Sequence, residues 1–205
     1  MITKWNIWIW FLAIRPKTLS AAFAPVMIGT TMAYSVGKGH AGAAIAALIC
    51  AILIQIGTNF ANDYFDYIKG ADNEERLGPL RVTQAGYVLP KTMFINFVLT
   101  FGLAALVGFY LVYRGGWPII LIGLLSIASG ILYTAGPWPL GYLGLGDIFV
   151  LIFFGPVAVC GTFYVQALEL TKEVFFAGFG PGLLATALLI VNNLRDEPTD
   201  RKAGK

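Results

Sequence analysis

Long apolar runs separated by short polar segments are the main pattern of this chain. Uncharged runs of about 20 residues are typical of helices that cross a lipid bilayer. The pattern predicts six such spans, which fall at approximately 19–36, 41–62, 93–113, 117–133, 148–168 and 174–194. We therefore expect an all-α fold, a polytopic transmembrane helix bundle, in which residues 1–205 form a single membrane domain.

Ahead of the first span, residues 4–12 are rich in tryptophan but too short to cross a bilayer. Such a segment is expected to lie in the membrane interface. Pro16 should end it, and Thr18 should cap the first spanning helix. A signal peptide cleaved near residues 22–24 is the alternative, which we disfavour because basic residues interrupt the apolar stretch that such a peptide needs.

Composition also favours a membrane protein that contacts the lipid bilayer. Of the residues, 58% are hydrophobic and 12% are charged, whereas a soluble domain has about 25% charged residues. The net charge of +3 is small, so we expect no nucleic-acid partner. Cys50 and Cys160 lie in apolar runs without metal-binding spacing and are interpreted as packing residues. His40 is expected to be a solvated loop residue.

Lysine and arginine residues are distributed unequally between the two sides of the predicted bundle. With the N-terminus inside, eleven fall on the inner side, namely Lys4, Arg15, Lys17, Lys69, Arg76, Arg81, Lys91, Arg195, Arg201, Lys202 and Lys205. Three fall on the outer side, namely Lys38, Arg114 and Lys172. Because cytoplasmic loops are enriched in these residues, we expect a multi-pass protein of the cell membrane (inner or plasma membrane) with a cytoplasmic N-terminus.

The second predicted span ends in a polar stretch at residues 59–66. On a helix, Asn59, Asn62, Asp63 and Asp66 stand at i, i+3, i+4 and i+7 and share one face. Ionisable groups at membrane depth are costly and indicate a functional site by default. A solvated helix end that carries caps and charges is the alternative interpretation.

A second polar cluster, residues 192–200, ends the sixth predicted span on the same cytoplasmic side. A bundle would bring the two clusters together around a shared cavity. Their carboxylate and amide oxygens suit Mg2+, which binds through carboxylates together with water and substrate phosphates. Zinc is disfavoured because the clusters contain neither histidine nor cysteine. Two ions held by opposed clusters would clamp a diphosphate and help it to leave.

Neighbouring segments add to this hypothesis. The long connection at 67–90 is interpreted as an ordered lid over the cytoplasmic mouth, with disorder as the alternative. The connection at 135–146 is rich in glycine and proline, which lets its backbone approach the cavity. Asp147 follows as either a site residue or an N-cap. Aromatic residues near the clusters are candidates to stabilise a carbocation, namely Phe60, Tyr64, Phe65 and Tyr133.

Residues 62–66, Asn-Asp-Tyr-Phe-Asp, and residues 196–205, Asp-Glu-Pro-Thr-Asp-Arg-Lys-Ala-Gly-Lys, resemble the two aspartate-rich motifs of the UbiA superfamily of intramembrane prenyltransferases. Stretches at 78–84, 141–147 and 192–196 resemble its 1,4-dihydroxy-2-naphthoate polyprenyltransferase branch, which acts in menaquinone synthesis. The resemblance covers nearly the whole chain. It implies Mg2+-dependent transfer of a polyprenyl group from polyprenyl diphosphate to 1,4-dihydroxy-2-naphthoate, with loss of diphosphate and CO2, to give demethylmenaquinone.

The resemblance also implies roles for individual residues. Asn62, Asp63 and Asp66 would bind the first Mg2+ and Asp196 and Asp200 the second, and the four aspartates would be catalytic. Residues expected to bind the diphosphate or the prenyl group are Asn59, Lys69, Arg81, Gln84, Tyr133, Asn192, Arg195, Arg201 and Lys202.

The chain departs from the family pattern at several positions. Gly70 stands where the superfamily has a third aspartate, and Asp72 is a candidate substitute. Pro137 stands where a lysine is expected four residues after Tyr133, which leaves Arg81 or Lys69 to contact the diphosphate. Pro198 is expected to place Asp196 and Asp200 on either side of a kink or helix end.

The family fold has nine helices, whereas six are predicted here, so the chain resembles a fragment of the usual enzyme. We expect such a fragment to bind Mg2+ and diphosphate weakly and to lack transfer activity alone, because an open site admits water. Two alternatives remain. One is a UbiA-type enzyme with another aromatic acceptor, and the other is a membrane transporter with an acidic cation site, which would place its acidic groups nearer the bilayer midplane.

Overall fold

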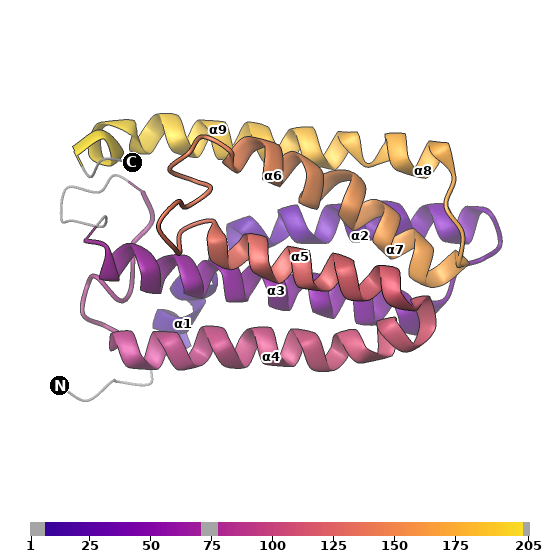
Figure 1. Ribbon diagram of the computed structural model, residues 1–205, viewed down its shortest axis with the longest axis horizontal. Helices are drawn as coiled ribbons and strands as arrows, with labels where there is room; N and C mark the ends of the chain where they lie inside the picture. The colour runs from indigo at the N-terminus through magenta and orange to yellow at the C-terminus, as the bar shows by residue number, and fades with distance from the viewer. Residues whose placement is uncertain (1–6, 71–77, 203–205) are drawn as a thin grey trace.

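In the computed structural model, residues 7–70 and 78–202 are described, with side chains as far as Glu197. Helices account for most of this part of the chain and lie side by side along its long axis (Figure 1). In order they are α1 Ile7–Ile14, α2 Pro16–Ser35, α3 Ala41–Ile68, α4 Pro90–Gly115, α5 Trp117–Leu132, α6 Gly146–Ile152, the π-helix η1 Phe153–Val157, α7 Ala158–Ala167, α8 Lys172–Ala177 and α9 Phe179–Lys202.

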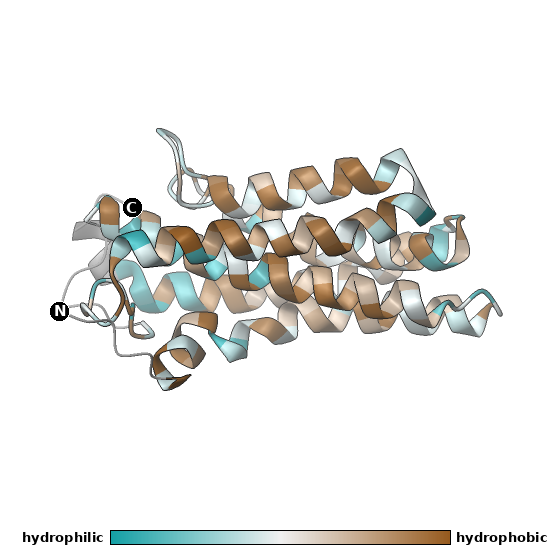
Figure 2. Cartoon of the chain, turned by 90° about the horizontal axis from the view of Figure 1, so that it is seen from below, coloured by the Kyte–Doolittle hydropathy of each residue, from teal (hydrophilic) through white to brown (hydrophobic). Residues whose placement is uncertain are grey.

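The helices confirm the prediction of an all-α, polytopic membrane bundle. Four segments are long and apolar enough to cross a membrane, namely Ala41–Ile68, Pro90–Gly115, Gly146–Ala167 and Lys172–Glu197. The pair α1 and α2, bent by 52°, is a fifth candidate, and α5 is a shorter apolar helix. Each of the six predicted spans thus coincides with a helix or a series of helices. Figure 2 shows apolar residues along the helices and hydrophilic residues gathered toward their ends.

The chain breaks between α1 and α2, as predicted at Pro16, but the cap there was predicted wrongly. Arg15 adopts a left-handed conformation with φ of 55°, and Pro16 is the first residue of α2. Proline suits this position because the first helical N–H has no intrahelical acceptor. Thr18 lies inside the helix, where its hydroxyl donates to the Arg15 carbonyl oxygen over 3.0 Å. It therefore does not cap α2.

The N-cap of α3 was not predicted from the sequence. His40 was expected to be solvated, but its Nδ1 accepts the Ala43 N–H over 3.2 Å and caps α3. A ring nitrogen can satisfy one of the otherwise unpaired donors at a helix start in the same way as a hydroxyl or carboxylate oxygen. This histidine is therefore a structural residue.

Two of the predicted spans are interrupted rather than continuous. η1 separates α6 from α7, and Gly155 within it has φ −111° and ψ −114°. Gly178 separates α8 from α9. The two breaks touch, since a Cβ on Gly155 would lie 2.8 Å from the Gly178 carbonyl oxygen, and one on Gly182 would lie 2.5 Å from the Leu151 carbonyl oxygen. Helices approach this closely in membranes where small residues face each other.

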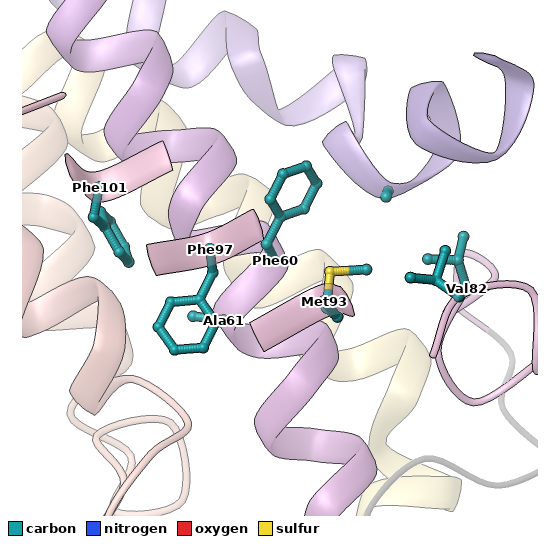
Figure 3. Packing of buried hydrophobic residues seen from close by; sticks show 8 residues of the cluster. Phe60, Ala61, Val82, Met93, Phe97 and Phe101 are labelled. Carbon is teal, nitrogen blue, oxygen red and sulfur yellow. The ribbon is translucent and has the colours of Figure 1, made fainter. Parts of the chain in front are cut away.

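Three buried clusters form the core. The first joins α1, α3, α4 and the segment that precedes α4, and its members include Phe60, Met93, Phe97 and Val82 (Figure 3). Val82 has no exposed surface, so this connecting segment is anchored in the core. The second cluster lies among α2, α3, α4, α5 and α7 and contains Cys50, which confirms that this cysteine is a packing residue.

Lysines and arginines lie at both ends of the bundle. The C-terminal ends of α3 and α9 and the N-terminal end of α4 lie together at one end (Figure 1), which carries Lys69, Lys91 and Arg195. The opposite end carries Lys38, Arg114 and Lys172. We call the first the acidic end because both aspartate clusters lie there, together with these basic residues.

Candidate active site

The first aspartate cluster lies on the buried face of α3, as its spacing predicts. Asn59 is 3% exposed, Asp63 is 2% exposed and Asp66 is fully buried. Asn62 is half-buried. A helix continuing to Ile68 therefore places two carboxylates in the protein interior, where leaving either one without donors would be costly.

Asp63 obtains its donors from the connecting segment that follows α3. Its Oδ2 accepts the Val82 N–H and its Oδ1 accepts the Thr83 N–H, each over 3.2 Å. Hydrogen bonds to a carboxylate are stronger than those between neutral groups. Both oxygens of Asp63 thus hold residues 78–89 against α3, and we call this segment the site loop.

Asp66 forms an ion pair with the same loop. Its Oδ2 lies 2.7 Å from Nη2 of Arg81, and the two side chains are 0% and 4% exposed. Removing one partner of a buried ion pair costs about 3–5 kcal/mol because the other charge is left uncompensated. Arg81 was predicted to bind diphosphate; in this structure it neutralises an aspartate that was predicted to bind Mg2+.

The second cluster, at the C-terminal part of α9, also contacts the site loop. Asp196 is 7% exposed, and Arg195 donates to both of its carboxylate oxygens over 2.7 and 3.0 Å. A Cβ on Gly78 would lie 3.0 Å from Asp196 Oδ2 and 3.1 Å from Arg195 Nη2. The start of the site loop is therefore packed on this ion pair, and only a glycine fits there without displacement.

The site loop joins the two aspartate clusters. Gly78 lies on Asp196, and Arg81, three residues later, pairs with Asp66. Three residues of chain span at most about 11 Å. The structure thus brings both clusters to one place, although they are far apart in sequence. Whether this loop acts as a lid stays a prediction, and residues 71–77 of the predicted lid, with Asp72, lie outside the described residues.

The loop between α5 and α6 forms another side of the site. Thr134 donates its hydroxyl to Asn62 Oδ1 over 3.0 Å. Lys69 donates to the Gly136 carbonyl oxygen over 3.0 Å, and its Nζ lies 5.1 Å from the centre of the Tyr142 ring. This is the close backbone approach that the glycine-rich sequence predicts.

Tyr133 packs against two glycines of the same loop, with its ring atoms 3.2 Å from a Cβ built on Gly141 and 3.1 Å from one on Gly146. Asp147 does not cap α6, because the N-cap is Leu145. In the described part of the chain its Oδ1 is buried and has no hydrogen-bond partner. The N-cap interpretation of Asp147 is therefore wrong, while a role in the site stays open.

Asn59 has a structural contact that the sequence did not suggest. Its amide nitrogen donates to the Ile14 carbonyl oxygen over 2.8 Å and to the Thr18 hydroxyl over 3.0 Å. Gln55, one turn earlier on α3, donates to the same hydroxyl over 3.2 Å. Together they fix the break between α1 and α2. Gln55 was missed, although a glutamine inside an apolar run is itself a signal of a buried hydrogen bond.

The predicted aromatic residues do not all lie at the aspartates. Phe60 packs edge-on against Trp10 of α1, with ring centres 5.9 Å apart. Tyr64 and Phe65 both pack against Phe97 of α4, at 5.8 Å. These three residues belong to the core between α1, α3 and α4. Tyr133, by contrast, lies next to Thr134 and hence beside Asn62.

The remaining predicted residues occupy the same end of the molecule. Gln84 and Asn192 are half-buried, and Arg195 is exposed apart from its bonds to Asp196. The side chains of Asp200, Arg201 and Lys202 lie outside the described residues. The α9 backbone continues to Lys202, so the helix does not end at Pro198. Thr83 was not predicted as a site residue. It is 2% exposed, and its hydroxyl has no hydrogen-bond partner within the described segments.

The donor set fits Mg2+ in chemistry but not in its present contacts. Within residues 7–70 and 78–197, no group of three or more histidine, cysteine, aspartate or glutamate side chains comes together. The buried carboxylates and Asn62 offer oxygen ligands, which Mg2+ prefers. Yet Asp63, Asp66 and Asp196 now accept bonds from protein donors. A cation at these carboxylates would therefore compete with these donors.

A polytopic helical bundle with two aspartate clusters at one end defines a class of membrane protein with a polar site at one end of its spans. The UbiA prenyltransferase family matches residues 22–205 of the chain. The chain therefore belongs to the UbiA prenyltransferase family.

Several curated proteins are similar to the chain over nearly its whole length. It is 43% identical over 202 residues to 1,4-dihydroxy-2-naphthoate octaprenyltransferase of Escherichia coli (strain K12), covering 96% of this chain and 66% of that protein. Proteins of the same name from Haemophilus influenzae and Mycobacterium tuberculosis are 40% and 39% identical, with 96% of this chain and 66% and 67% of theirs covered. The chain thus spans about two thirds of the length of these relatives.

Proposed function

We propose that this chain carries the diphosphate site of a prenyltransferase that transfers a polyprenyl group from polyprenyl diphosphate to 1,4-dihydroxy-2-naphthoate. The observation that carries the proposal is the convergence of both aspartate clusters on the site loop at one end of a membrane bundle. The names of the similar proteins support the acceptor and the type of reaction. Loss of CO2 and formation of demethylmenaquinone belong to the same proposal.

The acidic end supplies both signs of charge that diphosphate chemistry needs. Asn62, Asp63 and Asp66 would hold one Mg2+, and Asp196 and Asp200 a second. When bound, Mg2+ neutralises the negative charge that develops on the leaving diphosphate. A guanidinium binds phosphate oxygens through paired hydrogen bonds. Arg81 has this capacity once it leaves Asp66.

An apolar groove that runs along the bundle toward this end is suited to the prenyl chain. It lies between α2 and α9, has a volume of about 420 Å³, and is lined by Ser20, Ala21, Ala24, Ile28, Ala177, Gly180, Pro181, Leu184, Ala185 and Leu188. Leu188 stands one helical turn before Asn192 of the second cluster. A chain lying in the groove would therefore have its diphosphate end at the aspartates and its hydrocarbon among small apolar side chains.

The positions of the acidic residues favour this function over transport. A transporter with broken helices places its ion site near the bilayer midplane. Here Asp66 stands two residues before the end of α3, and Asp196 lies in the terminal part of α9. The breaks at Gly155 and Gly178 contact each other and not the aspartates. A UbiA-type enzyme with a different aromatic acceptor is the remaining candidate, because the aspartate site recognises only the diphosphate.

The direct test is a prenyl transfer assay in detergent. We would supply polyprenyl diphosphate and 1,4-dihydroxy-2-naphthoate, with and without Mg2+, to this chain and to a chimera in which it replaces the matching part of the E. coli protein. The proposal expects Mg2+-dependent demethylmenaquinone from the chimera. Product formed equally well in excess chelator, or formed only with another aromatic acceptor, would refute the metal or the acceptor respectively.

A further inference from the structure

Arg81 occupies a position on Asp66 that a cation would otherwise take. Its Nη2 lies 2.7 Å from Asp66 Oδ2, and both groups are almost completely buried. One turn earlier on α3, Asp63 is closed in a different way, by the N–H groups of Val82 and Thr83. Three consecutive residues of the site loop therefore place a positive charge and two hydrogen-bond donors on the same carboxylates that a divalent cation would bind.

We propose that Arg81 competes with a divalent cation for Asp66, so that cation binding releases residues 78–81 of the site loop from α3. The inference rests on the proposed function for the presence of the cation. It goes further by distinguishing a metal-free state from a metal-bound state of the site. The loop-bound arrangement is the metal-free state. In the metal-bound state Arg81 no longer pairs with Asp66 and turns to the diphosphate.

Competition follows from charge and space. Mg2+ binds oxygen ligands at about 2.0–2.1 Å and prefers octahedral geometry, whereas the guanidinium already lies in hydrogen-bond contact with Asp66. Two positive groups on one buried carboxylate repel each other at short range and in low dielectric. The two therefore compete for Asp66 Oδ2, and the arginine is the more easily displaced of the two side chains because it stands on a loop while Asp66 stands inside a helix.

The loop has a part that is anchored in the core and a part that is more exposed. The side chains of Val82 and Val88 are 0% and 1% exposed and belong to the core cluster with α3 and α4. Leu80, in contrast, is 47% exposed. Gly78, at the other end of the exposed part, lies on Asp196. Movement of residues 78–81 would therefore also change the contact between Gly78 and Asp196. Release of the loop would in this way affect both aspartate clusters together.

The test follows loop position and metal binding separately from catalysis. A spin label is placed on Leu80→Cys in the full chain with Cys50→Ala and Cys160→Ala, and Mg2+ is titrated without substrate. Mn2+ binding is measured directly by electron paramagnetic resonance. We expect the label to become more mobile as Mg2+ is added. In Arg81→Gln it should be mobile from the start, and Mn2+ should bind about tenfold more tightly.

Three further variants make the result decisive. Lys91→Gln removes one exposed positive charge from the same end and should leave Mn2+ affinity within about twofold of the wild type. Arg81→Lys keeps a charge without the fork geometry and should give intermediate affinity. In Asp66→Asn the label should not respond to Mg2+.

The outcomes separate this inference from the proposed function. Mn2+ binding that leaves the Leu80 label unchanged, or binding to Arg81→Gln that is no tighter than to the wild type, would overturn the competition while leaving a metal-dependent transferase intact. Absence of any Mn2+ binding at millimolar concentration would overturn both. Equal tightening in Arg81→Gln and Lys91→Gln would attribute the effect to net charge and would also overturn the competition.

Discussion

The end of the bundle opposite the aspartates also contains a network of hydrogen bonds between polar groups. In that network the acceptors are neutral oxygens and not carboxylates. Gln166 is 3% exposed; it donates to Thr30 Oγ1 over 3.1 Å and accepts the His40 N–H over 3.3 Å. Arg114 donates to the carbonyl oxygens of Val165 and Gln166 at the end of α7, over 2.6 and 3.2 Å. These bonds link α2, α4, α7 and the start of α3.

At the acidic end the buried groups are carboxylates, and the main donors come from a loop. Asp63 and Asp66 are held by Val82, Thr83 and Arg81. At the far end the acceptors are backbone carbonyls fixed at the end of a helix, whereas at the acidic end the donors stand on a connecting loop whose residues 79 and 80 are exposed. We expect the first network to stabilise the fold, and under the proposal above the second exchanges some of its bonds for a ligand.

The largest expected difference between the two ends is their exposure across the membrane. We expect Ala85→Cys in the site loop to be labelled by an impermeant maleimide only after cells are permeabilised, because the lysines and arginines concentrate at that end. Lys172→Cys at the opposite end should be labelled in intact cells. Labelling of position 85 from outside would reverse the orientation.

The next effect concerns catalysis. In the chimera described above, Asp63→Asn, Asp66→Asn and Asp196→Asn should each lower prenyl transfer by about 100-fold or more, since each removes the negative charge of a metal ligand while keeping its shape. Asp147→Ala should have a smaller effect. Near-normal transfer at saturating Mg2+ in any of the three asparagine variants would show that the corresponding aspartate has only a structural role.

At the opposite end, stability and not activity should change. Gln166→Ala leaves the His40 N–H and the Thr30 hydroxyl without this partner and should lower the free energy of unfolding by about 1–3 kcal/mol. Thermal unfolding in detergent measures this, with prenyl transfer per folded molecule as the second readout. A loss of transfer larger than the loss of folded protein would contradict the division between the two ends.

The smallest effect is expected at an exposed ion pair. Lys38 and Glu169 are 2.6 Å apart with side chains 45% and 46% exposed. Exposed pairs contribute about 0–1 kcal/mol, so Glu169→Gln should leave the unfolding temperature almost unchanged. This variant is a control for Gln166→Ala, because both lie at the same end. A destabilisation as large as that of Gln166→Ala would mean that the pair is part of the buried network.

The sequence predicts the helices well because apolar runs record which segments face lipid. It also predicts the shared face of Asn62, Asp63 and Asp66, since helical periodicity is a local property. The interruption at Gly155 was missed because a hydropathy pattern does not register a glycine and a proline that suit a close helix contact. Thr18 was wrongly predicted as a cap because the helix starts earlier, at Pro16.

The contacts of the site could not be predicted in the same way. Arg81 was expected to bind a phosphate, and its pairing with Asp66 depends on how a loop returns to α3. The N–H groups of Val82 and Thr83 carry no side-chain signal at all, because any residue except proline supplies such a donor. The site residues could be predicted from their chemistry and spacing in the sequence. Their hydrogen-bond partners depend on the tertiary structure and could not.

Binding of Mg2+ and inorganic diphosphate to the purified chain tests most directly whether the two clusters form one site. Calorimetric titrations would compare the wild type with Asp66→Asn and Asp196→Asn, with Glu169→Gln as a matched loss of one acidic charge at the far end. We predict that both aspartate variants lose Mg2+-dependent diphosphate binding and that Glu169→Gln keeps it. Binding to Asp196→Asn as tight as to the wild type, with loss only in Asp66→Asn, would show that the cluster on α9 is not part of the site.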